Sequence, residues 1–177
     1  MFDRLKERCR SRYVTKNVSI TEKRLATLRS ANLIGIIASI SSEADFEEIC
    51  SVYKQLHKDN KTVKMILYFD EKEVPPYCLN EQLADCFCKK DINWLGISNS
   101  TMIIDFLNTI FDVIIDFTCE ALKPIEVILQ CSKSKFITGG NSFFQNFYDL
   151  YMHNDSNNRQ LLLQNIDFYT YKLSGSK

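Results

Sequence analysis

The stretch from Asn32 to Ala38 reads NLIGIIA, a short run of branched aliphatic residues with a turn signal directly behind it. A run of this kind, without polar alternation, is typical of a strand buried on both faces of a parallel sheet. The same pattern returns in Val63–Phe69 (VKMILYF), in Val113–Phe117 (VIIDF) and, more briefly, in Lys135–Thr138. The sequence therefore predicts four buried central strands.

Segments with helical spacing of apolar residues lie between these strands. Ser42 and Asp45 form a variant of the capping box, and apolar residues follow them at spacings of three and four to about Lys58. Three further helices are predicted by the same criterion: Thr101–Ile110, Pro124–Cys131, and a C-terminal helix with Leu162, Ile166, Tyr169 and Leu173 on one stripe. Strands that alternate with helices of this length form crossover units with a parallel sheet.

Less regular sequence separates the second and third of these strands. Val74-Pro75-Pro76 disfavours helix and central strand, so residues 70–82 are expected to form a loop. One of the short apolar pieces that follow, 83–88 or 92–95, is expected to add an edge strand. We predict a single α/β domain over residues 30–177, with a doubly wound, mainly parallel, Rossmann-like sheet in three layers, preceded by a basic helical arm over residues 1–29.

Composition sets limits on the class of protein. The chain has 177 residues, of which 45% are hydrophobic and 25% charged, so it can build a full core without metals or disulfides. No continuous apolar run suited to a signal peptide occurs in the first 30 residues, and polar residues interrupt Met102–Phe117. We expect a cytoplasmic protein with reduced cysteines. Cys78, Cys86 and Cys88 lack the spacing of a zinc site, so no metal is expected.

Charge is distributed unevenly along the chain. Residues 1–29 carry nine Lys and Arg against three Asp and Glu, a net charge of +6, and the remaining residues carry −6. A basic arm of this kind favours an anionic partner, either nucleic acid or a membrane surface. The residues expected to contact it are Arg4, Lys6, Arg8, Arg10, Arg12 and Lys16. The alternative is a helix that docks on the body through Phe2, Leu5 and Cys9 while its cations offset the negative charge of the body.

Polar residues follow three of the predicted strands, where open α/β sheets bind ligands. They are Asp70, then Asp116 with Thr118, and finally Gly139, Gly140, Asn141 and Ser142. The last four residues can present backbone N–H groups to a phosphate at a helix start, or they can form a tight turn with a capping residue. Neither GxGxxG nor GxxxxGK[ST] occurs, so no nucleotide cofactor is indicated.

The segments KKDINWLG (89–96) and FDVIID (111–116), together with LIGII, YFDEKEVPPY and SKSKFITG, resemble a small bacterial family known only as a domain of unknown function. The resemblance extends from about Leu33 to Tyr151 and implies an α/β fold without an assigned activity. The second half also resembles the N-terminal Rossmann-like domain of lipopolysaccharide heptosyltransferases. Such enzymes need a second domain for the sugar nucleotide, and a chain of this length does not supply it.

Two functional hypotheses follow from these patterns. The first is a non-catalytic binding module that presents the basic arm to nucleic acid or an anionic membrane. The second is an enzyme or sensor that binds a nucleotide or sugar phosphate at the strand ends, related to half of a glycosyltransferase. The Pro-rich segment 74–77 with Trp94 is a candidate peptide-binding or homodimer surface, and packing of this segment on its own sheet is the alternative.

Overall fold

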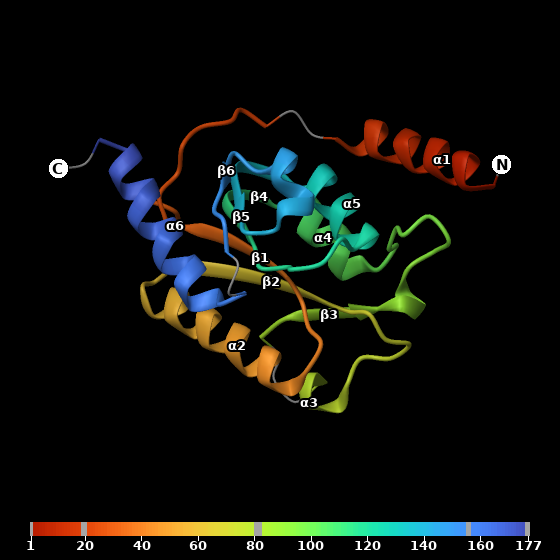
Figure 1. Cartoon of the computed structure of the whole chain (residues 1–177), viewed down its shortest axis with the longest axis horizontal. Helices are drawn as coiled ribbons and strands as arrows, with labels where there is room; N and C mark the ends of the chain where they lie inside the picture. The colour runs from red at the N-terminus through yellow and green to blue at the C-terminus, as the bar shows by residue number, and fades with distance from the viewer. Residues whose placement is uncertain (1, 19–20, 80–82, 155–156, 176–177) are drawn as a thin grey trace.

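The computed structural model describes residues 2–18, 21–79, 83–154 and 157–175. In that part the chain forms one six-stranded sheet in the order β3-β2-β1-β4-β5-β6, with all neighbouring strands parallel (Figure 1). The strands are β1 (Leu33–Ser39), β2 (Thr62–Phe69), β3 (Asp85–Cys88), β4 (Ile110–Asp116), β5 (Lys133–Gly139) and β6 (Leu150–Tyr151). The predicted doubly wound α/β fold is confirmed.

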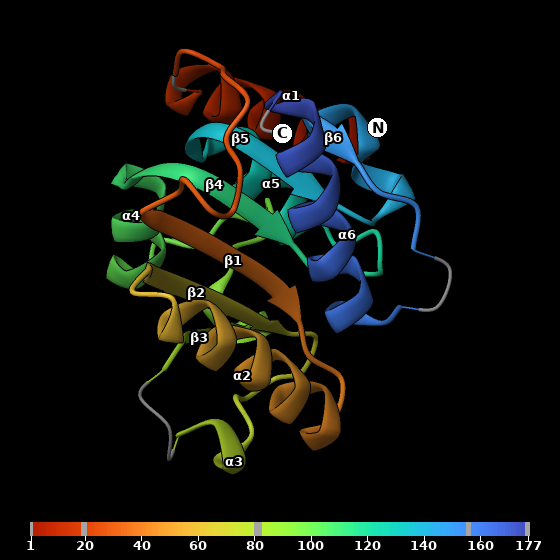
Figure 2. The same ribbon diagram turned by 90° about the vertical axis from the view of Figure 1, so that its left-hand side faces the viewer.

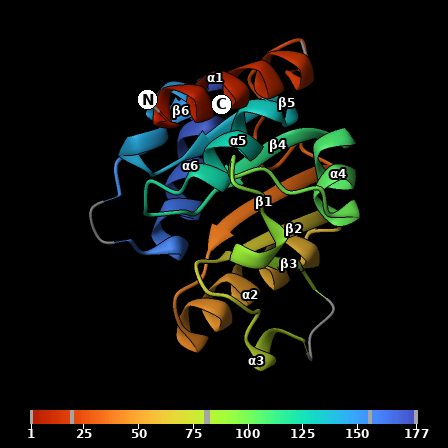
Figure 3. The ribbon, with the colours of Figure 1, turned by 90° about the vertical axis from the view of Figure 1, so that its right-hand side faces the viewer.

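Helices cover both faces of the sheet. They are α1 (Phe2–Asn17), α2 (Glu43–Lys58), α3 (Pro76–Leu79), α4 (Thr101–Asn108), α5 (Lys123–Cys131) and α6 (Arg159–Leu173), with 3-10 turns η1 (Lys89–Asp91) and η2 (Ser142–Phe147). Helices α2 and α6 lie side by side on one face (Figure 2), and α4 and α5 cover the other (Figure 3). The middle layer is therefore sealed from water on both sides.

Strand β1 lies at the centre, and its alternate side chains enter the two halves of the core. Ile34 and Ile36 pack in the half below α2 and α6, whereas Ile37 packs in the half below α4 and α5. Gly35 makes room in the second half, because an added Cβ would lie 3.1 Å from the Phe106 ring. The glycine in the opening apolar run is thus explained by close packing.

Helix α1 is docked on the outside of α5 (Figure 3). Tyr13 and Val14 pack beside Val127 of α5, and the buried Arg10 donates from Nε to the Leu95 carbonyl over 2.7 Å. Arg10 was expected to contact an anionic partner, and its burial contradicts that expectation. Of the residues in the docking alternative, Leu5 is 54% exposed and Cys9 is partly buried. The side chain of Phe2 lies outside the described residues.

The second part of the predicted arm belongs to the body. Ala26 and Leu28 lie in the core cluster below α2 and α6. The Arg24 N–H donates to the Lys135 carbonyl over 3.1 Å, and Lys23 pairs with Asp149 over 2.9 Å. The boundary expected at residue 29 therefore falls inside a segment that is already packed.

Other elements differ locally from the sequence predictions. Of the two candidate edge segments, 85–88 forms β3, and α3 occupies part of the predicted 70–82 loop. The stripe predicted for the last helix is partly wrong, because Tyr169 and Leu173 are exposed. The buried face of α6 is rotated relative to the predicted stripe, and it contains Arg159, Leu162, Leu163, Ile166 and Thr170.

The burial of the sheet generates a stability prediction. Ile36, Ile66 and Ile114 are fully buried and Phe136 is 5% exposed, as expected for a parallel sheet covered on both faces. Replacing Ile114 by Ala should lower the free energy of unfolding by about 2 to 5 kcal/mol, because a large aliphatic group leaves a cavity. His57→Ala, at the exposed end of α2, should change it far less. Urea titrations of both variants test this, and equal midpoints would contradict it.

Candidate functional site

A crevice opens where the strand order reverses, at the carboxyl ends of β1 and β4. After β1 the chain continues to β2 on one side, and after β3 it crosses to β4 on the other side. Loops that diverge in this way leave a gap in which open α/β sheets bind ligands. Two hollows of about 190 and 350 Å³ occupy this edge, and both are lined by Cys119, Asn157 and Arg159.

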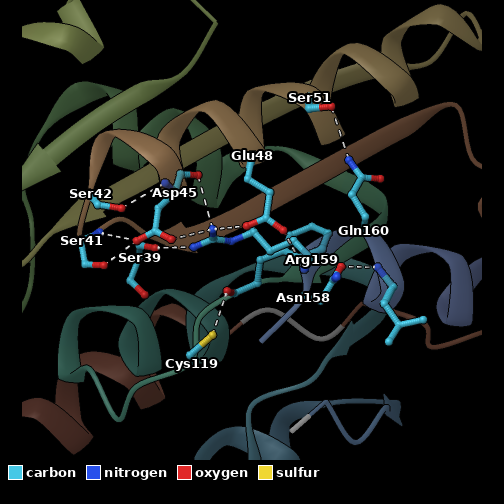
Figure 4. A network of polar contacts seen from close by, with 12 residues as sticks. Ser39, Ser41, Ser42, Asp45, Glu48, Ser51, Cys119, Asn158, Arg159 and Gln160 are labelled. Carbon is cyan, nitrogen blue, oxygen red and sulfur yellow. Dashed lines mark hydrogen bonds and ion pairs between the residues drawn. The ribbon is translucent and has the colours of Figure 1, made fainter. Parts of the chain in front are cut away.

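Arg159, the first residue of α6, is the organising side chain of the crevice (Figure 4). Its side chain is only 6% exposed, and Nη1 donates to Glu48 over 2.9 Å and to Asp45 Oδ1 over 3.3 Å. Nη2 donates to the Ser39 carbonyl over 3.1 Å. One guanidinium thus ties the end of β1 and the first turns of α2 to the start of α6.

The backbone at the start of α6 uses the same carboxylate. The Arg159 N–H donates to Glu48 over 3.0 Å, and the Asn158 side chain accepts from the Leu161 N–H over 2.8 Å. An anion at a helix N-terminus satisfies free N–H groups and interacts well with the helix dipole. Within the described residues, Arg159 Nε is the buried side-chain nitrogen that lacks a hydrogen-bond partner.

The larger space, which we call the acidic hollow, is lined by Ser39, Ile40, Ser41, Asp45, Asp70, Glu71, Cys119, Glu120, Leu122, Asn157 and Arg159. Four carboxylates and one guanidinium face it. Asp45 accepts hydrogen bonds from Ser41 and from Arg159, and although burial acts in the opposite direction, these contacts lower the pKa of Asp45. Asp70 pairs with Lys89 over 2.9 Å. The lining therefore carries more negative than positive charge.

The smaller space, which we call the neutral hollow, is lined by Phe117, Thr118, Cys119, Gly140, Asn141, Ser142, Tyr151, His153, Asn154, Asn157, Arg159 and Leu162. Hydroxyl and amide groups dominate this lining. Asn141 is buried and donates to Thr118 Oγ1 over 3.2 Å and to the Glu120 carbonyl over 2.9 Å. It therefore joins the loops that follow β4 and β5.

Asp116 lies beneath the crevice and is fully buried. Tyr148 donates to its Oδ2 over 2.6 Å, and the Thr118 N–H donates to its Oδ1 over 2.9 Å. Burial raises the pKa of Asp116 to about 6, although both hydrogen bonds act in the opposite direction. The burial and the nearby Asp116 charge also raise the pKa of Tyr148. These contacts link β4 to the loop before β6.

The double glycine has a packing role. A Cβ on Gly139 would lie 2.7 Å from Tyr148 Cζ and 2.9 Å from the Asp116 carbonyl oxygen, and one on Gly140 would lie 3.2 Å from the Met152 carbonyl oxygen. Two N–H groups beyond the glycines have internal acceptors, since Phe143 donates to the Asn141 side chain and Phe144 to the Asn141 carbonyl. This geometry fits the alternative of a tight turn with a capping residue, rather than a phosphate site.

The structure divides the residues predicted at the strand ends into three groups. Thr118, Gly140, Asn141 and Ser142 line the neutral hollow, Asp70 lines the acidic hollow, and Asp116 and Gly139 lie below both. Sequence reasoning missed Asp45 as a lining residue, Glu120 and Arg159. The sequence did hold a signal for Arg159, because this residue directly follows Asn158, a residue type that caps helices. The first turn of a helix near a sheet edge is a common place for a functional side chain.

Comparison with known proteins relates the whole unit to one family. The family that matches residues 6–173 is described as "Family of unknown function (DUF6913)". The chain belongs to this family. The DUF6913 match begins inside α1 and ends with α6, so the sheet, the crevice and all of α1 except its first four residues lie within it. No curated protein matches the chain, and a relationship to heptosyltransferases is not shown.

The buried carboxyl generates a pH prediction. Asp116 has a folded pKa of about 6, above its ordinary value of 3.8, so the unfolded chain releases this proton first as the pH rises. The contribution of Asp116 to stability should therefore fall between about pH 4 and pH 6. Asp116→Asn removes this titration with little change of shape. Urea unfolding of both proteins at pH 4, 5 and 7 measures their free energies of unfolding. The variant should gain stability relative to the wild type as the pH rises, and a constant difference would contradict a raised pKa of Asp116.

The guanidinium cluster generates a second prediction. Arg159→Ala should lower the free energy of unfolding by about 3 kcal/mol, because it leaves two partly buried carboxylates without their partner. The control is Arg29→Ala, which removes an exposed ion pair with Asp167 of α6. This substitution should lower the free energy of unfolding much less. Thermal and urea unfolding measure both. Equal losses would show that Arg159 does not hold α2 and α6 together.

Proposed function

We propose that this DUF6913 protein is a binding module that contacts a nucleic acid through the outward face of α1. The observation that carries the proposal is a row of Arg4, Arg8, Arg12 and Lys16 at a spacing of four residues. Residues at this spacing share one face of a helix. All four are exposed, and they lie opposite the side on which Arg10 and the adjoining residues dock.

The charges of this row are not cancelled locally. Glu7 pairs with the buried Arg10 over 2.8 Å, so it is engaged on the docked side of the helix. In the described part of the chain, none of the four outward cations makes an ion pair. Successive members are about 6 Å apart along the axis, and the row spans about 18 Å. Nucleic acid backbones offer a dense line of phosphates, and arginine binds phosphate in a bidentate manner.

Docking of α1 also favours nucleic acid over a membrane surface. A helix that lies in a bilayer interface buries a broad apolar face in the lipid. Here Tyr13 and Val14 face α5, and Leu5 and Val18 are the large apolar residues exposed near the cations among the described residues. Among the described residues, no helix has both the length and the hydropathy needed to cross a bilayer. Lipid binding would thus depend mainly on charge.

A nucleotide- or sugar-phosphate-binding enzyme or sensor at the strand ends has less support. The larger hollow there carries four carboxylates, which repel phosphate. The N–H groups of Phe143 and Phe144 already donate within the chain. We therefore place the anionic partner at α1 and leave the strand ends for a different class of ligand.

Charge removal on α1 tests the proposal. A variant in which Arg4, Arg8, Arg12 and Lys16 are replaced by Gln should keep the fold and bind a fluorescent 20-base DNA or RNA at least tenfold more weakly at low salt. For the wild-type protein, the slope of log K against log salt should be about −3 to −4 if all four cations contact phosphates. Point substitution is better than deletion of residues 1–16, because deletion would uncover Ile97 and Val127.

The matched control removes the same amount of charge from exposed positions outside α1. In this variant Gln replaces Lys54, Lys58, Lys72 and Lys90. This control should bind like the wild type. Equal weakening in both variants would indicate a general effect of net charge and contradict the proposal. Retention on vesicles with anionic lipid, without binding to nucleic acid, would also overturn it in favour of a membrane partner.

A further inference from the structure

We propose a second binding site, separate from α1, in which the crevice at the carboxyl ends of β1 and β4 holds a small hydroxylated amine. The ammonium group would occupy the acidic hollow and the hydroxyl groups the neutral hollow. The two spaces share Arg159, Asn157 and Cys119 in their linings, and we place one ligand across both.

The charge of the acidic hollow selects a cation. The Arg159 guanidinium is engaged by Asp45 and by Glu48, and Asp70 has Lys89 as its partner. Glu71 and Glu120 then remain, and in the described part of the chain neither side chain makes an ion pair. An ammonium group between these carboxylates gains charge-assisted hydrogen bonds, whereas a phosphate is repelled.

The neutral hollow selects hydroxyl groups. Thr118, Ser142 and Tyr151 contribute hydroxyls to its lining, and Asn154 and Asn157 contribute amides. Such groups donate and accept, as sugar or alcohol hydroxyls do. Leu162 and Phe117 provide apolar surface at the same wall.

Arg159 supplies an observation that is independent of the acidic residues. Its side chain is 94% buried at the junction of the hollows, and Nε has no hydrogen-bond acceptor. A buried donor without a partner costs free energy and usually marks the place of a water or a ligand atom. A hydroxyl oxygen held at the junction, directly or through one water, would satisfy it.

The size of the crevice fits a ligand of about one sugar ring. The hollows measure about 350 and 190 Å³, and openings to solvent remain at both because Glu71, Glu120 and Ser142 are exposed. Entry therefore needs no domain movement. The ligand class we infer is an amino sugar or a comparable amino alcohol in its protonated form.

A set of three sugars tests the sign and the position of the site. D-Glucosamine, D-glucose and D-glucose 6-phosphate differ mainly in charge, and binding to the full-length protein can be followed by saturation-transfer NMR and by chemical shift titration. Glucosamine should bind best, glucose at least threefold more weakly, and glucose 6-phosphate not measurably. Exchange of both Glu71 and Glu120 for Gln should weaken glucosamine at least threefold, to about the affinity for glucose, and so remove the preference.

The control exchanges Glu22 and Glu47 for Gln, an equal loss of charge from exposed residues that do not line either hollow. It should leave the affinity for glucosamine unchanged. Unfolding curves show whether each variant is folded. Equal binding of glucosamine and glucose, no binding of either up to about 20 mM, or preferential binding of glucose 6-phosphate would each overturn the proposal. Loss of nucleic acid binding by the α1 variant leaves this test unaffected, so the two proposals fail separately.

Discussion

Strand β1 must be paired on both edges and covered on both faces, and the positions of the other elements follow from this requirement. Its backbone is paired with β2 from Leu33 to Ser39 and with β4 from Ile34 to Ile37. Because its side chains alternate between two apolar layers, a pair of helices is needed on each side. The change of direction around β1 is also what opens the crevice, so core burial and the candidate site have one origin.

Acidic and basic side chains gather on different parts of the surface. Carboxylates collect around the carboxyl ends of β1, β2 and β4, whereas a row of cations faces outward from α1 on the far side of α5. A neutral total thus conceals two surfaces of opposite potential. In the two proposals above, each surface binds its own class of partner, and neither needs the other to be occupied.

The central strands were predictable from sequence because their signal is local. The run NLIGIIA identifies a doubly covered strand, and Ser42 with Asp45 marks the start of α2, whose cap accepts as expected. Contacts between distant residues left no such signal. The pairing of Arg159 with Asp45 spans 114 residues, and the docking of Arg10 on Leu95 spans 85. Periodicity reports which face of a helix is apolar, and in both cases the buried residue is an arginine.

The segment between α1 and β1 has a further consequence for how the chain behaves in concentrated solution. Strand β6 covers β5 only at Thr138 and Gly139, which would leave most of the outer edge of β5 open to pairing with another chain. Arg24 instead occupies the Lys135 carbonyl, and Asp149 takes both backbone groups of Ile137. Exposed strand edges are where folded proteins begin to aggregate. Because Arg24 and Asp149 occupy these backbone groups, the edge of β5 has fewer free donors and acceptors with which a second chain could pair.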